Sequence, residues 1–597
     1  MPTTIEVNKQ SVEALLGSGK SKPFVIPEYQ RPYAWTDEQV ETLFEDLWDF
    51  TATSGGTERE SSYFLGSVVS YENEDGEQEI IDGQQRITSL FLLLRAIYTK
   101  LVATPASERT AEANNFIGKI EPTIWRTNKL TGTVDFKNIL LTSRVVNNEG
   151  NEILRSILET GKADEDAKDN YSKNYRHFQE LFDKHSTENP LMVYQFIYAL
   201  LNQAILLPIT ADTQDTALTI FSTLNDRGLP LSDADIFKAK IYNQLAPDDK
   251  KAFIDRWKDL DEQSTDANES IQQLFYYNMF YYRALDKDTK TTTPGVRKYY
   301  AANKFERLYK PELLDTLFVI LNLWKVINKG EELEDEAWSK NIKIRQTLDI
   351  LTSYPNEYWK YPVVIYYVCY RNEENFETRF ARFLNKLLME LMTKYLMIPT
   401  INAVKPDILK LNSAIVVSDI PAFEFKTVDM TQLEPYIQNP NRNVVRMLLK
   451  TLAYEHQDDL LPAKWEIEHI FPQKWQTNYF PDEPDATIKE KIEHIGNKLP
   501  FEKKLNIVAG NGYFGKKKKE YTASKIVITK AMGTSDVMDW NLESITKRDI
   551  RVSDEVIKIM NRWNNEYLNT PVSECKAGEP SEEELAQIEK FKKNGWI

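Results

Sequence analysis

Cysteine is almost absent from this sequence, since 597 residues contain only Cys369 and Cys575. Two cysteines exclude a disulfide scaffold and a cysteine-rich zinc module, and they are typical of a reducing compartment. The chain also has no run of about 18 apolar residues, and its start, MPTTIEVNKQ, lacks a charged segment followed by an apolar one. We therefore expect a cytoplasmic protein without a membrane partner.

Two further absences narrow the fold class and the kind of nucleotide site. The sequence has no repeat of fixed period and no low-complexity tract, which excludes a solenoid and a long biased segment. It has no GxxxxGK[ST] loop, so any nucleotide site is not of the P-loop kind. What is present is a soluble globular composition, 42% hydrophobic and 27% charged, in a chain long enough for roughly two to four domains.

Positive charge is also in deficit. The net charge of −16 argues against a protein that coats nucleic acid, because Lys and Arg supply the nonspecific affinity for phosphates. Residues 491–530 are an exception, with ten Lys against three Glu and a local charge of +7. This basic segment follows the Glu468–His469 pair, which is discussed below.

The apolar pattern predicts an α+β multidomain protein with three regions, 1–245, 246–440 and 441–597. Residues 250–455 are predicted to be mostly amphipathic helices. Within them the aromatic run FYYNMFYYR, residues 275–283, could be a platform for stacking bases. In a helical region such a run is more typical of a core or an interface.

The first region mixes strand and helix signals. Strands are expected at 63–71 and 77–82 around the turn ENEDGE, and helices at 36–50 and 84–98. Loops are expected at 103–116 and 160–170, and residues 172–245 are expected to be α-rich.

The motif EIEHIFPQ, residues 466–473, alternates apolar and polar residues and predicts a short strand that ends near Pro472. An isolated Glu468–His469 pair is also typical of a surface strand with an incidental histidine. Downstream spacing favours a site instead, because Asn497 follows His469 by 28 residues and Asn506 follows nine residues later. His suits a general base near neutral pH, and Glu and Asn oxygens suit Mg²⁺ or Mn²⁺.

This order of residues resembles the HNH endonuclease family, whose nuclease domain has the ββα-metal fold, in its variant with a final Asn instead of His. The resemblance implies that Glu468 is a metal ligand, His469 is the general base and Asn497 orients that base. It implies that Asn506 is the second metal ligand, with Asn511 as an alternative. A bound Mg²⁺ or Mn²⁺ would stabilise the charge that develops on the scissile phosphate of a nucleic acid.

Two features near this motif have alternatives. His456 and His494 lie close to it in the sequence and could instead ligate zinc, although no cysteine accompanies them. The lysine run Lys516, Lys517, Lys518 and Lys519 could be a solvated helix face. In an otherwise acidic chain, after a phosphodiesterase motif, we interpret it as a DNA-contact patch.

A second cluster lies near the N-terminus, in IPEYQRPYAW and IIDGQQR. Asp82 and Gly83 predict a tight turn before a helix whose first backbone N–H groups could bind an anion. Arg86 in the first helical turn opposes the helix dipole unless it has something to bind, and a phosphate would satisfy both. The aromatics Tyr29, Tyr33 and Trp35 taken alone would be core or edge residues.

These two strings and the segment IFSTLNDRGLPLS resemble GmrSD-type modification-dependent (type IV) restriction endonucleases. Their N-terminal domain is ParB/sulfiredoxin-like, and the HNH variant is its C-terminal partner. The resemblance covers roughly residues 8–245 and 440–570, which makes 1–245 a nucleotide-binding and DNA-sensing domain, 246–440 a helical middle and 441–597 the nuclease domain.

The resemblance implies binding and hydrolysis of a nucleoside triphosphate, GTP or ATP, in the N-terminal domain. The implied nucleotide residues are Gln30, Arg31, Asp82, Gly83, Gln84, Gln85 and Arg86. Tyr29, Tyr33 and Trp35, with Gln30, could form the surface that senses modified DNA. Asn225, Arg227 and Gly228 could be a second wall of this pocket or a polar turn.

The resemblance therefore implies a modification-dependent DNA endonuclease of anti-phage defence that hydrolyses phosphodiesters with a metal ion. A homodimer is a possible form of it. In relatives the modification is glucosylated hydroxymethylcytosine or a phosphorothioate backbone. One rival is a ParB-like regulator that binds DNA under nucleotide control without cleavage. The other is an HNH nuclease directed against RNA, since the motif recognises phosphate and metal but not the sugar.

Overall fold

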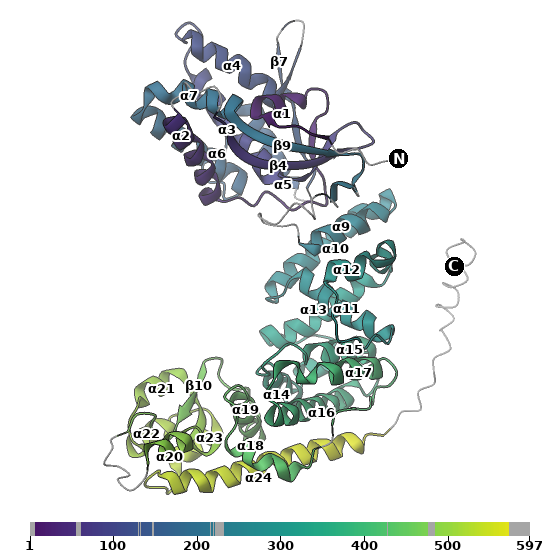
Figure 1. The fold of residues 1–597 in the computed structure, drawn as a ribbon, viewed down its shortest axis with the longest axis vertical. Helices are drawn as coiled ribbons and strands as arrows, with labels where there is room; N and C mark the ends of the chain where they lie inside the picture. Colours follow the sequence, from purple (N-terminus) through teal and green to yellow (C-terminus); the bar gives the residue numbers. More distant parts are fainter. Residues whose placement is uncertain are drawn as a thin grey trace, which may run out of the picture. The chain divides into compact units, whose positions relative to one another are not determined.

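A computed structural model describes residues 6–54, 61–128, 131, 133–145, 148–214, 216–218, 220, 232–426, 428–475 and 484–571. The chain divides into two compact units, Met1–Asp259 and Leu260–Ile597 (Figure 1). The first unit contains a mixed sheet with helices, and the second is mostly helical with a small hairpin. The predicted α+β multidomain class is therefore confirmed, while the three finer domain boundaries stay predictions.

The first unit is built on a seven-stranded sheet with the order β1-β9-β4-β5-β3-β8, in which β2 also pairs with β9. The strands are β1 (Glu6–Val7), β2 (Gln10–Ser11), β3 (Phe24–Ile26), β4 (Tyr63–Glu72), β5 (Gln78–Asp82), β8 (Leu141–Ser143) and β9 (Ala204–Ala211). β4 and β5 are antiparallel, as the predicted hairpin around ENEDGE requires, whereas β4 and β9 are parallel. A separate two-stranded sheet pairs β6 (Trp125–Thr127) with β7 (Val134–Ile139).

Helix α3 (Gln84–Ala103) is the centre of the core of this unit. Its predicted apolar positions Ile87, Leu90, Phe91, Leu94 and Ile97 are all fully buried. α3 packs against α4, α5 and α6, so it is apolar on nearly every side and needs no polar face. The other α-helices among the described residues are α1 (Val12–Ser18), α2 (Asp37–Ser54), α4 (Ala111–Ile124), α5 (Asn148–Thr160), α6 (Asn170–Glu188), α7 (Val193–Tyr198), α9 (Asp233–Gln244) and α10 (Pro247–Asp266), of which α10 continues into the second unit.

Two elements of this unit differ from the prediction. The stretch 103–116 is not all loop, because α4 begins at Ala111 with the Thr110 side chain as its N-cap. The predicted α-rich stretch 172–245 contains β9, which lies inside the sheet between β4 and the pair β1 and β2. Its sequence AILLPITA is a continuous apolar run after a helix, a pattern that cannot distinguish a buried strand from a helix.

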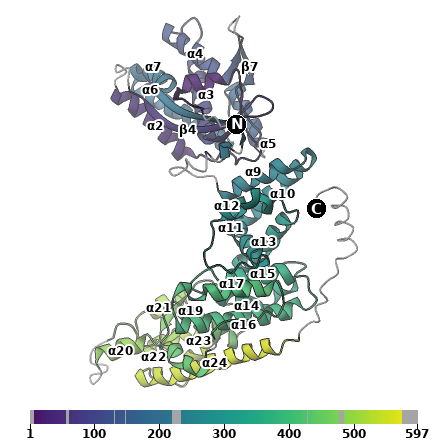
Figure 2. The same cartoon turned by 45° about the vertical axis from the view of Figure 1, so that its right-hand side comes forward.

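The second unit begins with a stack of helices, as the predicted helical middle requires (Figure 2). A hairpin follows these helices in the chain. The helices before the hairpin are α11 (Ile271–Leu285), α12 (Val296–Ala301), α13 (Leu313–Lys329), α14 (Ile342–Leu351), α15 (Lys360–Tyr370), α16 (Phe376–Met397), α17 (Lys405–Ile415), α18 (Glu434–Gln438) and α19 (Val445–His456). Most of the aromatic run 275–283 on α11 is buried, so its interpretation as core is confirmed. No described helix is long and apolar enough to cross a bilayer.

The hairpin pairs β10 (Trp465–His469) with β11 (Lys498–Glu502) in antiparallel register. The connection between the two strands contains α20 (Asp485–Ile492). Three short helices follow the hairpin, namely α21 (Lys503–Ala509), α22 (Phe514–Thr522) and α23 (Val527–Thr534). The 27-residue helix α24 (Leu542–Leu568) contacts α20 and the turn before β11 with its first half, and it also packs on α16, α18 and α19. Figure 1 shows this helix, in yellow, running beneath the helices around the hairpin and beneath the helices of the preceding stack.

Candidate functional site

Strand β10 places Glu468 and His469 on opposite faces of the hairpin. In the register, Glu468 lies opposite Leu499 and His469 opposite Lys498. Because side chains alternate along a strand, Glu468 points inward and is only 4% exposed, while His469 is partly exposed. The predicted strand is confirmed, and it gives the two residues different environments.

The Glu468 carboxylate is anchored through one of its oxygens. Its Oε1 lies 2.7 Å from the Lys517 Nζ and accepts a hydrogen bond from the Tyr521 hydroxyl at 2.6 Å. Burial and the nearby Glu468 raise the pKa of Tyr521, so the hydroxyl remains a neutral donor. No residue that the structure describes bonds Oε2, which leaves this oxygen for a ligand.

The His469 imidazole lies beside an acidic residue. Its Nε2 is 3.5 Å from Glu493 Oε1 and 3.5 Å from Gln473 Nε2. Burial lowers the pKa of His469 below its ordinary value, and Glu493 opposes this shift. The imidazole is therefore predominantly neutral at pH 7 and able to accept a proton.

Asn497 is fully buried and bonds the backbone that follows His469. Its Oδ1 accepts from the Phe471 N–H at 2.7 Å, and its Nδ2 donates to the Phe471 carbonyl at 3.0 Å. The same side chain also bonds the Ile492 carbonyl and the Trp540 indole. Asn497 thus fixes the chain two residues beyond the predicted base. Its predicted orienting role, which stays a prediction, would act through the backbone.

Asn506 and Asn511 use their amides differently. Asn506 Nδ2 donates to Glu466 Oε2 at 3.2 Å, which holds the amide and leaves Oδ1 without a bond to any described residue. Asn511 uses both polar atoms on the backbone of Lys474, with Nδ2 donating to its carbonyl and Oδ1 accepting from its N–H. Of the two candidates, Asn506 is the one with an oxygen left to bind a cation.

The turn that carries Asn497 is clamped by two neighbouring residues of α24. Arg548 Nη1 donates to three backbone carbonyls, those of Ile495, Gly496 and Lys498, at 2.8–3.2 Å. Asp549 accepts from the Gly496 N–H and from His494 Nδ1, both at 2.7 Å. Burial lowers the pKa of Arg548 to about 10, so it stays charged at neutral pH. Nothing in the sequence identified Arg548 or Asp549, because they lie some 50 residues from the turn and have no motif.

In the first unit, the predicted DGQQR turn lies between β5 and α3. Gly83 is the N-cap of α3 with a positive φ of 86°, and a Cβ there would lie 3.1 Å from the Ser67 carbonyl. No side chain caps this helix, so its first turn can accept an anion. Burial raises the pKa of Asp82, and the nearby Arg86 and Arg31 oppose the rise.

The three glutamines predicted to bind nucleotide bond other parts of the protein. Gln84 Nε2 donates to Gln30 Oε1, and Gln30 Nε2 donates to the Ile81 carbonyl. Gln85 accepts from the Ala34 N–H at 2.7 Å and donates to the Pro32 carbonyl at 3.1 Å. These amides hold the YQRPYAW segment against the turn, and a nucleotide role for them stays a prediction.

Both ends of the chain match known family models. Residues 12–242 match the GmrSD restriction endonuclease N-terminal domain, and residues 429–552 match the GmrSD restriction endonuclease C-terminal domain. The two matches together cover more than half of the chain, in the order that the motifs predict. The chain belongs to the GmrSD restriction endonuclease family. The family predicted from the motifs is thereby confirmed. No curated protein matches the chain.

The C-terminal GmrSD match includes the hairpin, Asn506, the lysine run and the Arg548–Asp549 clamp. Within it, the lysine run is not one exposed patch, which corrects the predicted DNA contacts. Lys517 is 1% exposed, and Lys518 donates to the Ser535 and Val537 carbonyls. Lys516 and Lys519 are exposed and remain candidates for phosphate contact.

The N-terminal GmrSD match includes the aromatic residues predicted to sense DNA, and two of them are core residues. Tyr29 and Tyr33 are 4% and 7% exposed. The Tyr33 hydroxyl is 2.6 Å from Ser89 Oγ, its ring stacks on Tyr171, and Tyr29 bonds Glu79. Burial therefore contradicts a DNA-sensing role for these two rings. A sensing role for Trp35, which is half-buried, stays a prediction. Asn225, Arg227 and Gly228 lie outside the described residues.

The zinc alternative is not supported by how its histidines are paired. His494 bonds Asp549, and His456 Nε2 lies 2.6 Å from Glu555 Oε1. Among the residues that the structure describes, no three His, Cys, Asp or Glu side chains are grouped so that they could hold a metal. These two histidines thus serve separate contacts with α24.

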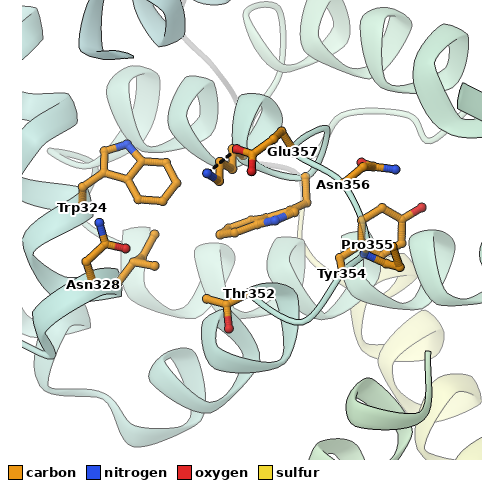
Figure 3. A pocket seen from close by; sticks show the side chains of 10 residues that line it. Trp324, Asn328, Thr352, Tyr354, Pro355, Asn356 and Glu357 are labelled. Carbon is orange, nitrogen blue, oxygen red and sulfur yellow. Dashed lines mark ion pairs between the residues drawn. The ribbon is translucent and has the colours of Figure 1, made fainter. Parts of the chain in front are cut away.

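The region between the two GmrSD matches contains a cavity of about 240 Å³ (Figure 3). Its lining includes Trp324 and Trp359, with ring centroids 6.0 Å apart, as well as Tyr354, and it includes the ion pair between Glu357 and Lys360. Tyr277 of α11, which does not line the cavity, stacks on Trp324. The residues that line this cavity do not include any predicted site residue.

Proposed function

We propose that this GmrSD-family protein is an HNH-type, modification-dependent DNA endonuclease that hydrolyses phosphodiesters with Mg²⁺ or Mn²⁺. The observation that carries the proposal is how the two predicted metal ligands are held. Glu468 and Asn506 each bond the protein through one polar atom and leave one oxygen, Oε2 and Oδ1, unbonded. A partly exposed, neutral imidazole, His469, directly follows Glu468 in the chain.

The donor set fits a hard divalent cation. A carboxylate and an amide oxygen suit Mg²⁺ or Mn²⁺, which keep several waters and need few protein ligands. When bound, the cation would stabilise the charge on the scissile phosphate. Glu468 and Asn506 would hold it.

The remaining steps belong to residues of the chain. His469 would accept a proton from the attacking water, which its lowered pKa permits at neutral pH. Asn497 would keep the backbone beyond His469 in place through its bonds to Phe471. The exposed Lys516 and Lys519 would contact phosphates beside the cut.

The N-terminal domain would bind and hydrolyse GTP or ATP and so regulate cleavage. Support comes from the uncapped first turn of α3, which can hold a phosphate next to Arg86 and Arg31. A ParB/sulfiredoxin-like fold agrees with the mixed sheet and this strand-to-helix turn.

A parallel cleavage assay tests this function against its rivals. The purified protein is incubated with Mg²⁺ or Mn²⁺, with and without GTP or ATP. The three substrates are modified DNA, unmodified DNA and RNA, all with the same base sequence. We expect cuts in modified DNA first. Cleavage of RNA alone would favour the RNA-directed nuclease, and nucleotide-dependent DNA binding without any cut would favour the ParB-like regulator.

A further inference from the structure

The four lysines of α22 are divided by the geometry of the helix. Phe514, Lys517 and Tyr521 are three and four residues apart, share one face and are all buried. Lys516 and Lys519 lie on other faces and are exposed. A lysine with 2% of its side chain exposed cannot reach a DNA phosphate in this conformation.

The Lys517 ammonium bonds both halves of the Glu468–His469 pair. Its Nζ lies 2.7 Å from Glu468 Oε1 and donates to the His469 backbone carbonyl at 2.5 Å. Burying an ammonium is costly unless it is paired and hydrogen-bonded, and these two contacts supply that compensation. The same two contacts tie the carboxylate to the backbone of the next residue.

We propose that Lys517 is a positioning residue of the nuclease centre rather than a DNA contact. The inference rests on the proposed function, because it needs Glu468 to be a metal ligand and His469 the base. Lys517, together with Tyr521, occupies Oε1 of Glu468 and thereby presents Oε2 to the cation. Through the His469 carbonyl it also fixes the base relative to that carboxylate.

This role predicts a different kinetic defect from that of the exposed lysines. Loss of Lys517 removes the positive charge beside the buried carboxylate and leaves only the Tyr521 hydroxyl bonded to it, so cation binding and turnover should suffer. Loss of an outer-shell partner of a metal ligand typically costs about 10- to 100-fold in metal affinity or activity. Loss of Lys516 or Lys519 should instead weaken DNA binding and its dependence on salt.

The test compares Lys517→Met with Lys516→Met and Lys519→Met, which make the same change on the same helix. The readouts are the Kd for Mn²⁺ by calorimetry, and kcat and KM for modified DNA. We expect Lys517→Met to raise the Mn²⁺ Kd and lower kcat, each about 10- to 100-fold, with little change in KM. The other two variants should raise KM and keep the wild-type Mn²⁺ Kd.

A second variant covers a failure of Lys517→Met to fold, which circular dichroism detects. Lys517→Gln keeps two N–H donors without the charge, and we expect the same defects at smaller size. Wild-type Mn²⁺ Kd and kcat in whichever Lys517 variant folds, with a change only in KM, would overturn the inference. If the wild-type protein neither binds Mn²⁺ nor cuts DNA, the proposed function itself fails.

Discussion

Asp549 accepts a hydrogen bond at 2.7 Å from the backbone N–H of Gly496, the residue before Asn497. The approach is so close that a Cβ on Gly496 would lie 2.3 Å from the Ile545 carbonyl oxygen and 2.6 Å from Asp549 Oδ1. The buried turn before β11 therefore depends on a residue without a side chain. α24 reaches it only because that position is glycine.

Gly496→Ala should accordingly destabilise the second unit. Overpacking a close contact costs about 1–3 kcal/mol, and here the contact is with backbone that cannot rotate away. Gly515→Ala on α22 is the matched control, because a Cβ there meets nothing within 4 Å. Thermal unfolding followed by circular dichroism should show a lower midpoint temperature for Gly496→Ala than for the wild type. Gly515→Ala should not lower the midpoint. Equal midpoints would mean that the turn is not clamped as described.

Asn506→Ala should weaken Mn²⁺ binding, whereas Asn511→Ala should not. The reason is that Asn506 has an amide oxygen without a protein partner, while both polar atoms of Asn511 bond Lys474. Calorimetry with Mn²⁺ on the two variants measures the difference. A larger loss of affinity in Asn511→Ala would move the second ligand to that residue.

The acid limb of the pH profile of kcat/KM should lie below pH 6.5. Burial lowers the pKa of His469, and only the neutral imidazole accepts a proton, so activity rises with pH through that lowered value. Glu493 opposes the shift, so Glu493→Gln should move the limb to still lower pH. An acid limb above pH 6.5 in the wild type would contradict the neutral-base account.

Arg86→Ala should lower the rate of nucleoside triphosphate hydrolysis, because Arg86 stands in the uncapped first turn of α3 and its guanidinium interacts with Asp82 while it donates to the Ser67 carbonyl. Gln85→Ala serves as a comparison, since its amide bonds only protein backbone. We expect Gln85→Ala to lower stability by about 1–2 kcal/mol. A phosphate-release assay that finds unchanged turnover in Arg86→Ala would place the nucleotide site elsewhere.

The sequence predicted elements whose signals are local. The β4–β5 hairpin, α3 and the β10 strand follow from alternation, helical spacing and turn residues, and all three are present. β9 was missed because its apolar run gives no periodicity, and its place in the sheet depends on pairing with β4, more than a hundred residues away. Lys517 was misassigned for a related reason, since the letters KKKK do not show which lysine faces the core.

Residues that support the candidate site were harder to predict than residues proposed to act in it. Glu468 and His469 stand next to each other in a short motif, but Tyr521 and Asp549 reach the site through folding alone. For Tyr33 the residue type was the better guide than the family resemblance. An aromatic taken alone is a core or edge residue, and the Tyr33 hydroxyl bonds Ser89 and Asn174 inside the core.

The most direct test of the central claim is the nicking of modified DNA by His469→Ala in the presence of Mg²⁺. The account predicts that this variant loses cleavage by about 100-fold or more, as expected for the loss of a general base. It should keep its fold, its Mn²⁺ affinity and its nucleoside triphosphate hydrolysis. Cleavage at the wild-type rate by His469→Ala would contradict the assignment of the nuclease centre to Glu468 and His469.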